Sequence, residues 1–114
     1  MPLSVKDVSE MQKYINGVME RSNHHAGNVN EVVLAMAGAI VWKKDTDKPI
    51  QVMIHEGETK NVLWIYINRT RYAFSYNHKS GQIELRKGST QGKVLYSFDN
   101  ASTVSQIKQI FETL

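Results

Sequence analysis

Aromatic and polar residues alternate on two neighbouring segments of this sequence, in a pattern that could bind a flat ligand or a partner. Trp64 and Tyr66 are two residues apart, and Arg71 and Ser75 follow after a short turn. If both segments are strands of one hairpin, these four side chains share one face. Aromatic rings beside a guanidinium group can stack a planar ligand or a nucleobase. This face could instead be covered by a helix of the same chain or by a second copy, and both alternatives stay open.

Two adjacent histidines precede an expected helix start. A helix N-terminus presents free backbone N–H groups and the positive end of the helix dipole, so it can bind a phosphate or carboxylate. The sequence therefore predicts an anion site formed by His24, His25 and Asn28, with a solvated loop as the alternative. No second histidine or acidic residue stands at the spacing of metal ligands, and we expect neither a metal site nor a cofactor.

One acidic pattern resembles an enzyme site. Glu31 and the segment Ile83–Lys87 resemble the acidic helix residue and the Glu-x-Lys strand of metal-dependent nucleases. Those enzymes need a further aspartate at a strand end to hold the cation, and no expected strand ends in one. The chain also has no cysteine and no Gly-x-Ser-x-Gly turn, so nucleophilic catalysis has no support. We expect a protein without enzymatic activity, and a small hydrolase or nuclease using His24, His25 and Glu31 is the less favoured alternative.

Basic residues at the ends of expected hairpins suggest a second kind of partner. The formal net charge of +3 is mild, because a dedicated nucleic-acid domain usually concentrates more basic charge on one face. Binding of nucleic acid is therefore an alternative hypothesis. The residues that would carry it are Arg69, Arg71, Lys79, Arg86 and Lys87.

Length and composition favour one compact domain over residues 1–114. The chain has 114 residues, is 41% hydrophobic and contains only 2 prolines. Its longest apolar run, Val32–Trp42, is shorter than the roughly 20 residues that span a bilayer. The first residues lack the basic and apolar segments of a secretion signal, so we expect a cytoplasmic protein without a membrane contact.

Two helices are expected in the first half of the chain. The first begins with a cap at Ser4 and ends before a polar connection over residues 21–27. The second covers Asn28–Lys44, with Asn28 and Glu31 as a capping box. Its apolar run leaves no polar side, so we expect this helix to be enclosed. The end of the run, Ala39–Lys44, could instead form a strand, and periodicity alone does not decide.

The second half of the chain predicts five strands and a last helix. A two-residue turn at 68–69 would place Leu63 opposite Phe74 and Ile65 opposite Tyr72. The last helix would be capped by Asp99, Asn100 or Ser102, with an apolar stripe running to the end of the chain. The fold class is α+β, an antiparallel sheet of about five strands with two helices before it and one after it. The strands are expected at 50–56, 61–67, 70–76, 82–87 and 93–98.

Two short segments resemble a known group of proteins. The run His24–Val33 and the segment Tyr96–Asn100 are similar to small proteins carried on mobile gene cassettes of bacterial integrons. This resemblance implies a compact, often oligomeric bacterial domain with no assigned activity, and it transfers no site residue. Our hypothesis is a homodimeric binding or interaction protein that uses the face around Trp64 for a ligand or protein partner.

Overall fold

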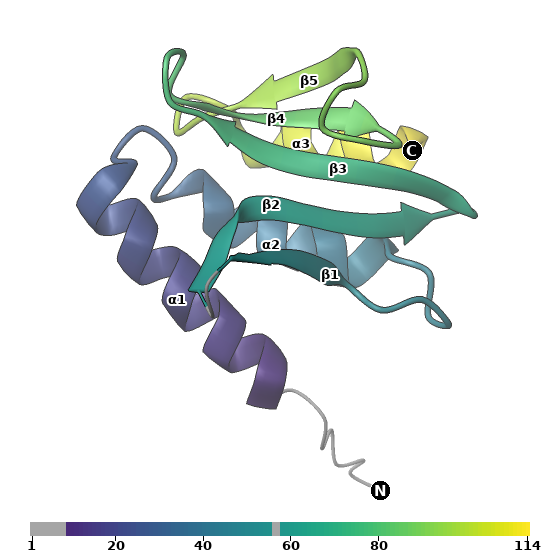
Figure 1. Ribbon diagram of the computed structural model, residues 1–114. Helices are drawn as coiled ribbons and strands as arrows, with labels where there is room; N and C mark the ends of the chain where they lie inside the picture. Colours follow the sequence, from purple (N-terminus) through teal and green to yellow (C-terminus); the bar gives the residue numbers. More distant parts are fainter. Residues whose placement is uncertain (1–8, 56–57) are drawn as a thin grey trace, which may run out of the picture.

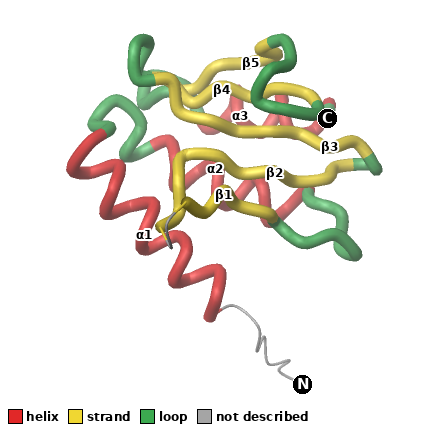
Figure 2. The backbone as a smooth tube through the Cα atoms, in the orientation of Figure 1, coloured by secondary structure: helices red, strands yellow, loops and turns green. Residues whose placement is uncertain are grey.

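The computed structural model describes residues 9–55 and 58–114, and its sheet is a simple antiparallel meander. The strands β1 to β5 are paired in chain order, between two helices that precede the sheet and one that follows it (Figures 1 and 2). The prediction of an α+β fold with five antiparallel strands is therefore confirmed. The elements are α1 (Ser9–His25), α2 (Val32–Lys43), β1 (Gln51–His55), β2 (Glu58–Ile67), β3 (Thr70–Asn77), β4 (Gln82–Lys87), β5 (Val94–Phe98) and α3 (Val104–Thr113).

Helices α2 and α3 lie together on one face of the sheet, which we call the inner face (Figure 1). Alternate strand residues such as Ile65, Phe74 and Leu85 point into this layer and are buried, as the two-residue period of a strand requires. The ring of Phe74 stacks on that of Phe111 from α3, with centroids 6.0 Å apart. The core thus lies between the sheet and these two helices, and the opposite, outer face holds Trp64, whose strand neighbours point inward.

The predicted register of the β2–β3 hairpin is confirmed. Leu63 pairs with Phe74 and Ile65 pairs with Tyr72. The two turn residues, Asn68 and Arg69, have φ angles of 50° and 68°, the left-handed conformation of a two-residue hairpin turn. This register puts Trp64 and Tyr66 on the face predicted for them.

The first hairpin differs from the prediction. We expected a turn over residues 57–60, but β2 already begins at Glu58 and pairs with His55. The expected strand over 50–56 starts one residue later, at Gln51. Its last residue, and residue 57 of the turn, lie outside the described residues. The longer β2 is possible because an irregularity between Val52 and Ile54 shifts the pairing of β1.

Helix α1 ends later in the chain than predicted. The polar connection expected from residue 21 is wrong, because α1 continues to His25 and the N–H of Ala26 still donates to the carbonyl of Ser22. Asn23, His24 and His25 at this end of the helix are exposed, while Ser22 is buried and Arg21 is partly buried. Their polarity therefore marked an exposed surface and not a loop. The expected cap at Ser4 lies outside the described residues.

Helix α2 begins at Val32, so the predicted capping box of Asn28 and Glu31 is wrong. The amides of Glu31 and Val32 donate instead to the side chain of Asn100, at 3.0 and 2.9 Å. The doubtful end of the run is helical up to Lys43.

The prediction that α2 is enclosed on all sides is also wrong. The fractional exposure is 61% for Leu34, 53% for Val41 and 54% for Trp42. The reason is the number of layers: a helix that covers a sheet in a two-layer arrangement keeps its other side toward the solvent.

The last helix confirms the predicted stripe but not its cap. Ile107 and Phe111 are buried, whereas Val104 is 71% exposed. The cap is Thr103, whose hydroxyl accepts from the N–H of Gln106, while the side chain of Gln106 accepts from the N–H of Thr103. The three expected cap residues, Asp99, Asn100 and Ser102, form the preceding turn, because a capping box needs a Gln or Glu three residues after the cap.

Candidate functional site

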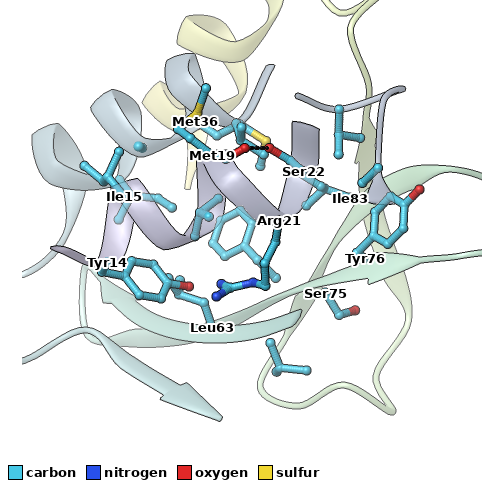
Figure 3. A pocket seen from close by; sticks show the side chains of 18 of the residues that line it. Tyr14, Ile15, Met19, Arg21, Ser22, Met36, Leu63, Ser75, Tyr76 and Ile83 are labelled. Atoms are coloured by element: carbon cyan, nitrogen blue, oxygen red, sulfur yellow. Dashed lines mark hydrogen bonds between the residues drawn. The ribbon is translucent and has the colours of Figure 1, made fainter. Parts of the chain in front are cut away.

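A cavity of about 390 Å³ lies between α1, α2 and the inner face of the sheet (Figure 3). It is found at the end of the sheet where β3 turns into β4 and where α1 passes beside α2 (Figure 1). Most of its lining is aliphatic. These side chains are Met11, Ile15, Val18 and Met19 of α1, Val33, Met36, Ala37 and Ile40 of α2, and Ile50, Val62, Leu63 and Ile83 from the sheet and the segment before it.

The cavity follows from how α1 presents its apolar side. Met11, Ile15, Val18 and Ser22 recur every three or four residues, so they lie along one side of the helix. Among the residues of α1, only Ser22 is buried, although the apolar side chains of this stripe point toward the rest of the domain. Helix α1 therefore closes over the inner face without filling the space beneath it.

Several polar groups line the same cavity. The pKa of the Tyr14 hydroxyl is raised because the side chain is buried, and the positive charge of Arg21 opposes part of that increase. The buried hydroxyl of Ser22 donates to the carbonyl of Met19 at 3.1 Å, so its hydrogen is used. The rings of Tyr76 and His78 meet edge to face, with centroids 4.9 Å apart. Among its described residues, the lining includes no aspartate or glutamate.

Of the described residues of this lining, Arg21 carries a permanent charge. It is partly buried, and its side chain extends over the cavity in the direction of Tyr14 and Leu63 (Figure 3). Within residues 9–55 and 58–114, no hydrogen bond or ion pair engages its guanidinium group. A partly buried guanidinium without an acceptor is a suitable partner for an incoming anion.

The outer face brings together most of the residues that the sequence placed there. The guanidinium carbon of Arg71 lies 5.2 Å from the ring centroid of Trp64, and the ammonium of Lys48 lies 5.5 Å from that of Tyr66. Both are cation–π contacts. Since α2 and α3 lie on the inner face, neither helix covers this pair of aromatic residues. A partner or ligand on this face remains a prediction.

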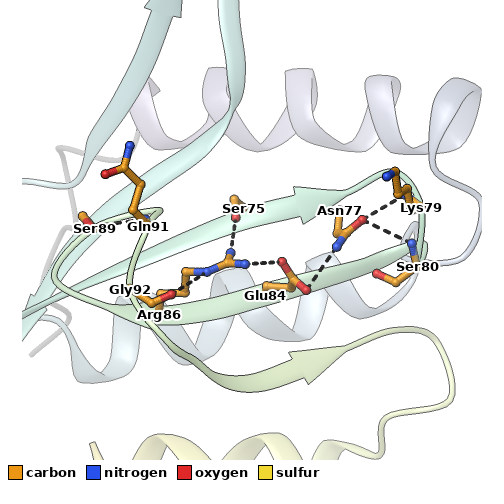
Figure 4. A network of polar contacts seen from close by, with 9 residues as sticks. All are labelled: Ser75, Asn77, Lys79, Ser80, Glu84, Arg86, Ser89, Gln91 and Gly92. Atoms are coloured by element: carbon orange, nitrogen blue, oxygen red, sulfur yellow. Dashed lines mark hydrogen bonds and ion pairs between the residues drawn. The ribbon is translucent and has the colours of Figure 1, made fainter.

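Ser75, the fourth predicted residue, lines the cavity and also belongs to a polar network centred on Arg86 (Figures 3 and 4). Arg86 donates to Ser75 at 3.1 Å, to the carbonyl of Gly92 at 3.0 Å, and pairs with Glu84 at 2.7 Å. Asn77 also donates to the carboxylate of Glu84, at 3.2 Å. The network ties the loop before β5 to β4, so Glu84 and Arg86 of the nuclease-like segment have structural partners.

The five basic residues of the nucleic-acid hypothesis do not share one surface. Arg69 pairs with Asp47 at 2.6 Å in the turn before β3, and Lys79 lies in the turn after β3. At about 3.3 Å per residue, the length of β3 separates these two turns by more than 20 Å. Arg86 donates a hydrogen bond to Ser75. Lys87 lies opposite Tyr72 in the pairing of β3 with β4, so it is on the inner face of the sheet.

The predicted anion site assumed that the two histidines precede a helix that begins at Asn28, but α1 includes both histidines and α2 begins at Val32. His24 and His25 end α1, where the dipole favours cations, and the first amides of α2 already donate to Asn100. Glu31 precedes α2 on the helix side of the sheet, so it does not meet Glu84 on the outer face. Among the described residues, no group of three His, Cys, Asp or Glu could hold a metal ion.

Comparison with known families adds the decisive observation on identity. A family model described as integron cassette protein VCH_CASS1 chain matches residues 11–108. The chain belongs to this family. The resemblance of His24–Val33 and Tyr96–Asn100 to integron cassette proteins is thereby confirmed, and both segments lie inside the matched region of the cassette protein. No curated protein matches this cassette protein. Among its described helices, none is long and apolar enough to cross a membrane.

The cavity was not predicted from the sequence of the cassette protein. Methionine usually fills core space, so Met11, Met19 and Met36 give no signal in the sequence that they line a cavity. A signal was present in α1, because Arg21, Ser22 and His25 continue the inward spacing that Tyr14 and Val18 begin. Polar residues at inward positions of an amphipathic helix indicate either a buried network or a cavity.

Proposed function

We propose that the cassette protein is a non-enzymatic binding protein and that it holds a small, mainly apolar ligand between α1, α2 and the sheet. The observation that carries this proposal is the cavity of about 390 Å³ with its aliphatic lining. Ligand pockets typically have volumes of about 300 to 1,000 Å³ and are lined mostly by apolar side chains. Such a space does not hold water well, because water needs several polar partners.

The incomplete burial of the apolar side of α1 supports the same proposal. Tyr14, Ile15, Val18 and Met19 are only partly buried although they face the domain. A ligand in the cavity would remove more of this apolar surface from water, at about 25 cal/mol for each Å². The three methionines of the lining are flexible enough to adapt to ligands of different shape.

The experiment is binding of a neutral apolar dye, N-phenyl-1-naphthylamine, to the full chain. We expect saturable fluorescence enhancement with one dye per chain. Ala37→Leu adds a larger side chain at the cavity wall and should lower the affinity for the dye by tenfold or more. Gly38→Ala changes the next residue of α2, where an added Cβ meets open space, and should leave dye binding unchanged. A wild-type chain that binds no dye, or an Ala37→Leu variant that binds it equally well, contradicts the proposal.

A second candidate function is self-association of two copies in the bacterial cytoplasm. The specific observation is the exposed apolar stripe of Leu34, Val41 and Trp42 on the solvent side of α2. The outer-face pair of Trp64 and Tyr66 offers a second surface for the same purpose. Exposed apolar patches on a small domain often mark protein contacts.

Sedimentation of the wild type and two variants tests this candidate. A dimer that Trp42→Glu dissociates would assign the contact to α2, and one that Trp64→Ala dissociates would assign it to the outer face. A wild type that sediments as a monomer at all accessible concentrations would reject self-association.

A further inference from the structure

We propose that the ligand of the cavity is a small aliphatic monocarboxylate, held with its carboxylate on Arg21. This inference rests on the proposed function, since it names the class of ligand for that site. It depends on three observations, namely the charge of the lining, the state of the Arg21 side chain and the size of the space.

The charge of the lining favours an anion. Arg21 contributes a permanent positive charge, and among the described residues of the lining there is no aspartate or glutamate to balance it. A cationic ligand would therefore meet the like charge of Arg21. An anion would gain an attraction that is strengthened by the apolar surroundings, where screening by water is reduced.

The guanidinium of Arg21 is available for such an anion. No hydrogen bond or ion pair within residues 9–55 and 58–114 engages this group. Its planar arrangement of N–H donors matches the two oxygens of a carboxylate, which can accept two parallel hydrogen bonds. Figure 3 shows the side chain above the apolar wall formed by residues such as Leu63. A carboxylate placed on Arg21 would thus have its chain directed along this wall.

The size and chemistry of the wall define the remainder of the ligand. A cavity of about 390 Å³ lies near the lower end of the ~300 to 1,000 Å³ that ligand pockets typically have, so we expect a small ligand. The lining is dominated by methionine, isoleucine, valine, leucine and alanine, and these side chains favour contact with a flexible aliphatic chain over specific stacking of rings. Decanoate is a small carboxylate with a flexible aliphatic chain and is the probe for the test.

The test compares three probes that share one chain and differ in the head group: decanoate, decanol and decylammonium. Each is titrated against the dye-loaded full chain below its micelle concentration. We expect decanoate to bind at least tenfold more tightly than decanol, because a hydrogen bond to a charged group contributes more than one to a neutral group. Decylammonium should bind most weakly. Arg21→Gln should reduce the affinity for decanoate to that for decanol, and it should leave the affinity for decanol unchanged.

The matched control is Arg71→Gln, which removes a positive charge from the outer face and should change none of the three affinities. Equal affinity of decanoate and decanol for the wild type would overturn the carboxylate assignment, while their displacement of the dye would leave the proposed function standing. A chain that binds neither the dye nor any probe would reject both. If Arg21→Gln does not fold, as judged by circular dichroism, the ratio of decanoate to decanol affinity in the wild type decides the matter.

Discussion

The side-chain oxygen of Asn100 accepts a hydrogen bond of 2.9 Å from the backbone N–H of Val32, the first residue of helix α2. The two residues are 68 positions apart in the chain. The same oxygen accepts from Glu31, and the Asn100 amide nitrogen donates to the carbonyl of Gly27 at 3.1 Å and to Asn30 at 2.8 Å. A residue of the turn after β5 thus caps the helix on which the cavity is built.

Asn100→Ala should lower the free energy of unfolding by about 1 to 2 kcal/mol, because it leaves the first amides of α2 without their acceptor. Asn100→Asp keeps an acceptor oxygen but loses the donor to Gly27, so it should lower the free energy of unfolding by less than Asn100→Ala does. Asn16→Ala, on the exposed side of α1, serves as the control and should change stability by less than about 0.5 kcal/mol. Urea unfolding measures all three. Equal stability of the wild type and Asn100→Ala would show that the cap contributes nothing.

Asp45 binds the turn of the β2–β3 hairpin in a similar way. Its two carboxylate oxygens accept from the amides of Asn68 and Arg69, each at 2.9 Å. Asp45→Ala should cost about 1 to 2 kcal/mol, because both turn residues hold left-handed conformations that these bonds stabilise. Asp47→Ala removes only an exposed ion pair with Arg69 and should leave the urea midpoint almost unchanged. A larger loss in Asp47→Ala than in Asp45→Ala would contradict this account.

The sheet was predictable from the sequence because its signals are local. The alternation of Leu63, Ile65 and Ile67 with Val62 and Trp64 sets the faces of β2, and a two-residue turn then fixes the register. The cap of α2 was not predictable in this way, since Asn28 offers a local cap that fits the sequence equally well. The contact that replaces it joins residues that are distant in the chain.

The candidate site was predictable only in part, for the same physical reason. The pairing of Trp64 with Arg71 follows from the strand register and was expected. The cavity depends on how far α1 stands from the sheet, and this distance is set by tertiary packing and not by the spacing of Tyr14, Val18 and Arg21 in the sequence. A stripe of this kind predicts a buried side but not how well that side is filled.

Gly81 lies where the β3–β4 turn approaches the turn before α2. Its φ angle of 69° is left-handed, and a Cβ at this position would collide with the side-chain amide of Asn28. Gly81→Ala should therefore cost about 1 to 2 kcal/mol for the conformation, and only a little more for the contact, because the colliding atom lies at the flexible end of the Asn28 side chain. Gly88→Ala is the matched control, because its φ is 85° and its Cβ would meet open space.

The collision can be separated from the conformation by a double-mutant cycle. Gly81→Ala should lose more stability than Gly88→Ala, and Asn28→Ala in the Gly81→Ala background should restore the difference. An equal loss at both glycines would show that Asn28 simply moves aside.

The ionisation of Tyr14, which lines the cavity, should make the stability of the protein depend on pH. Burial raises the pKa of its hydroxyl above the ordinary value of 10.0, and the charge of Arg21 holds that increase back. Because the phenolate forms more readily in the unfolded chain, the contribution of this group to stability is complete below about pH 10 and is lost as the pH rises through the pKa of the folded state. The stability of the wild type relative to Tyr14→Phe should therefore be constant below pH 10 and fall above it.

Difference absorbance between the two proteins isolates Tyr14 from the other tyrosines, and Arg21→Gln should move its titration to still higher pH. Ionisation of Tyr14 at or below its ordinary pKa would show that the side chain is not buried beside the cavity.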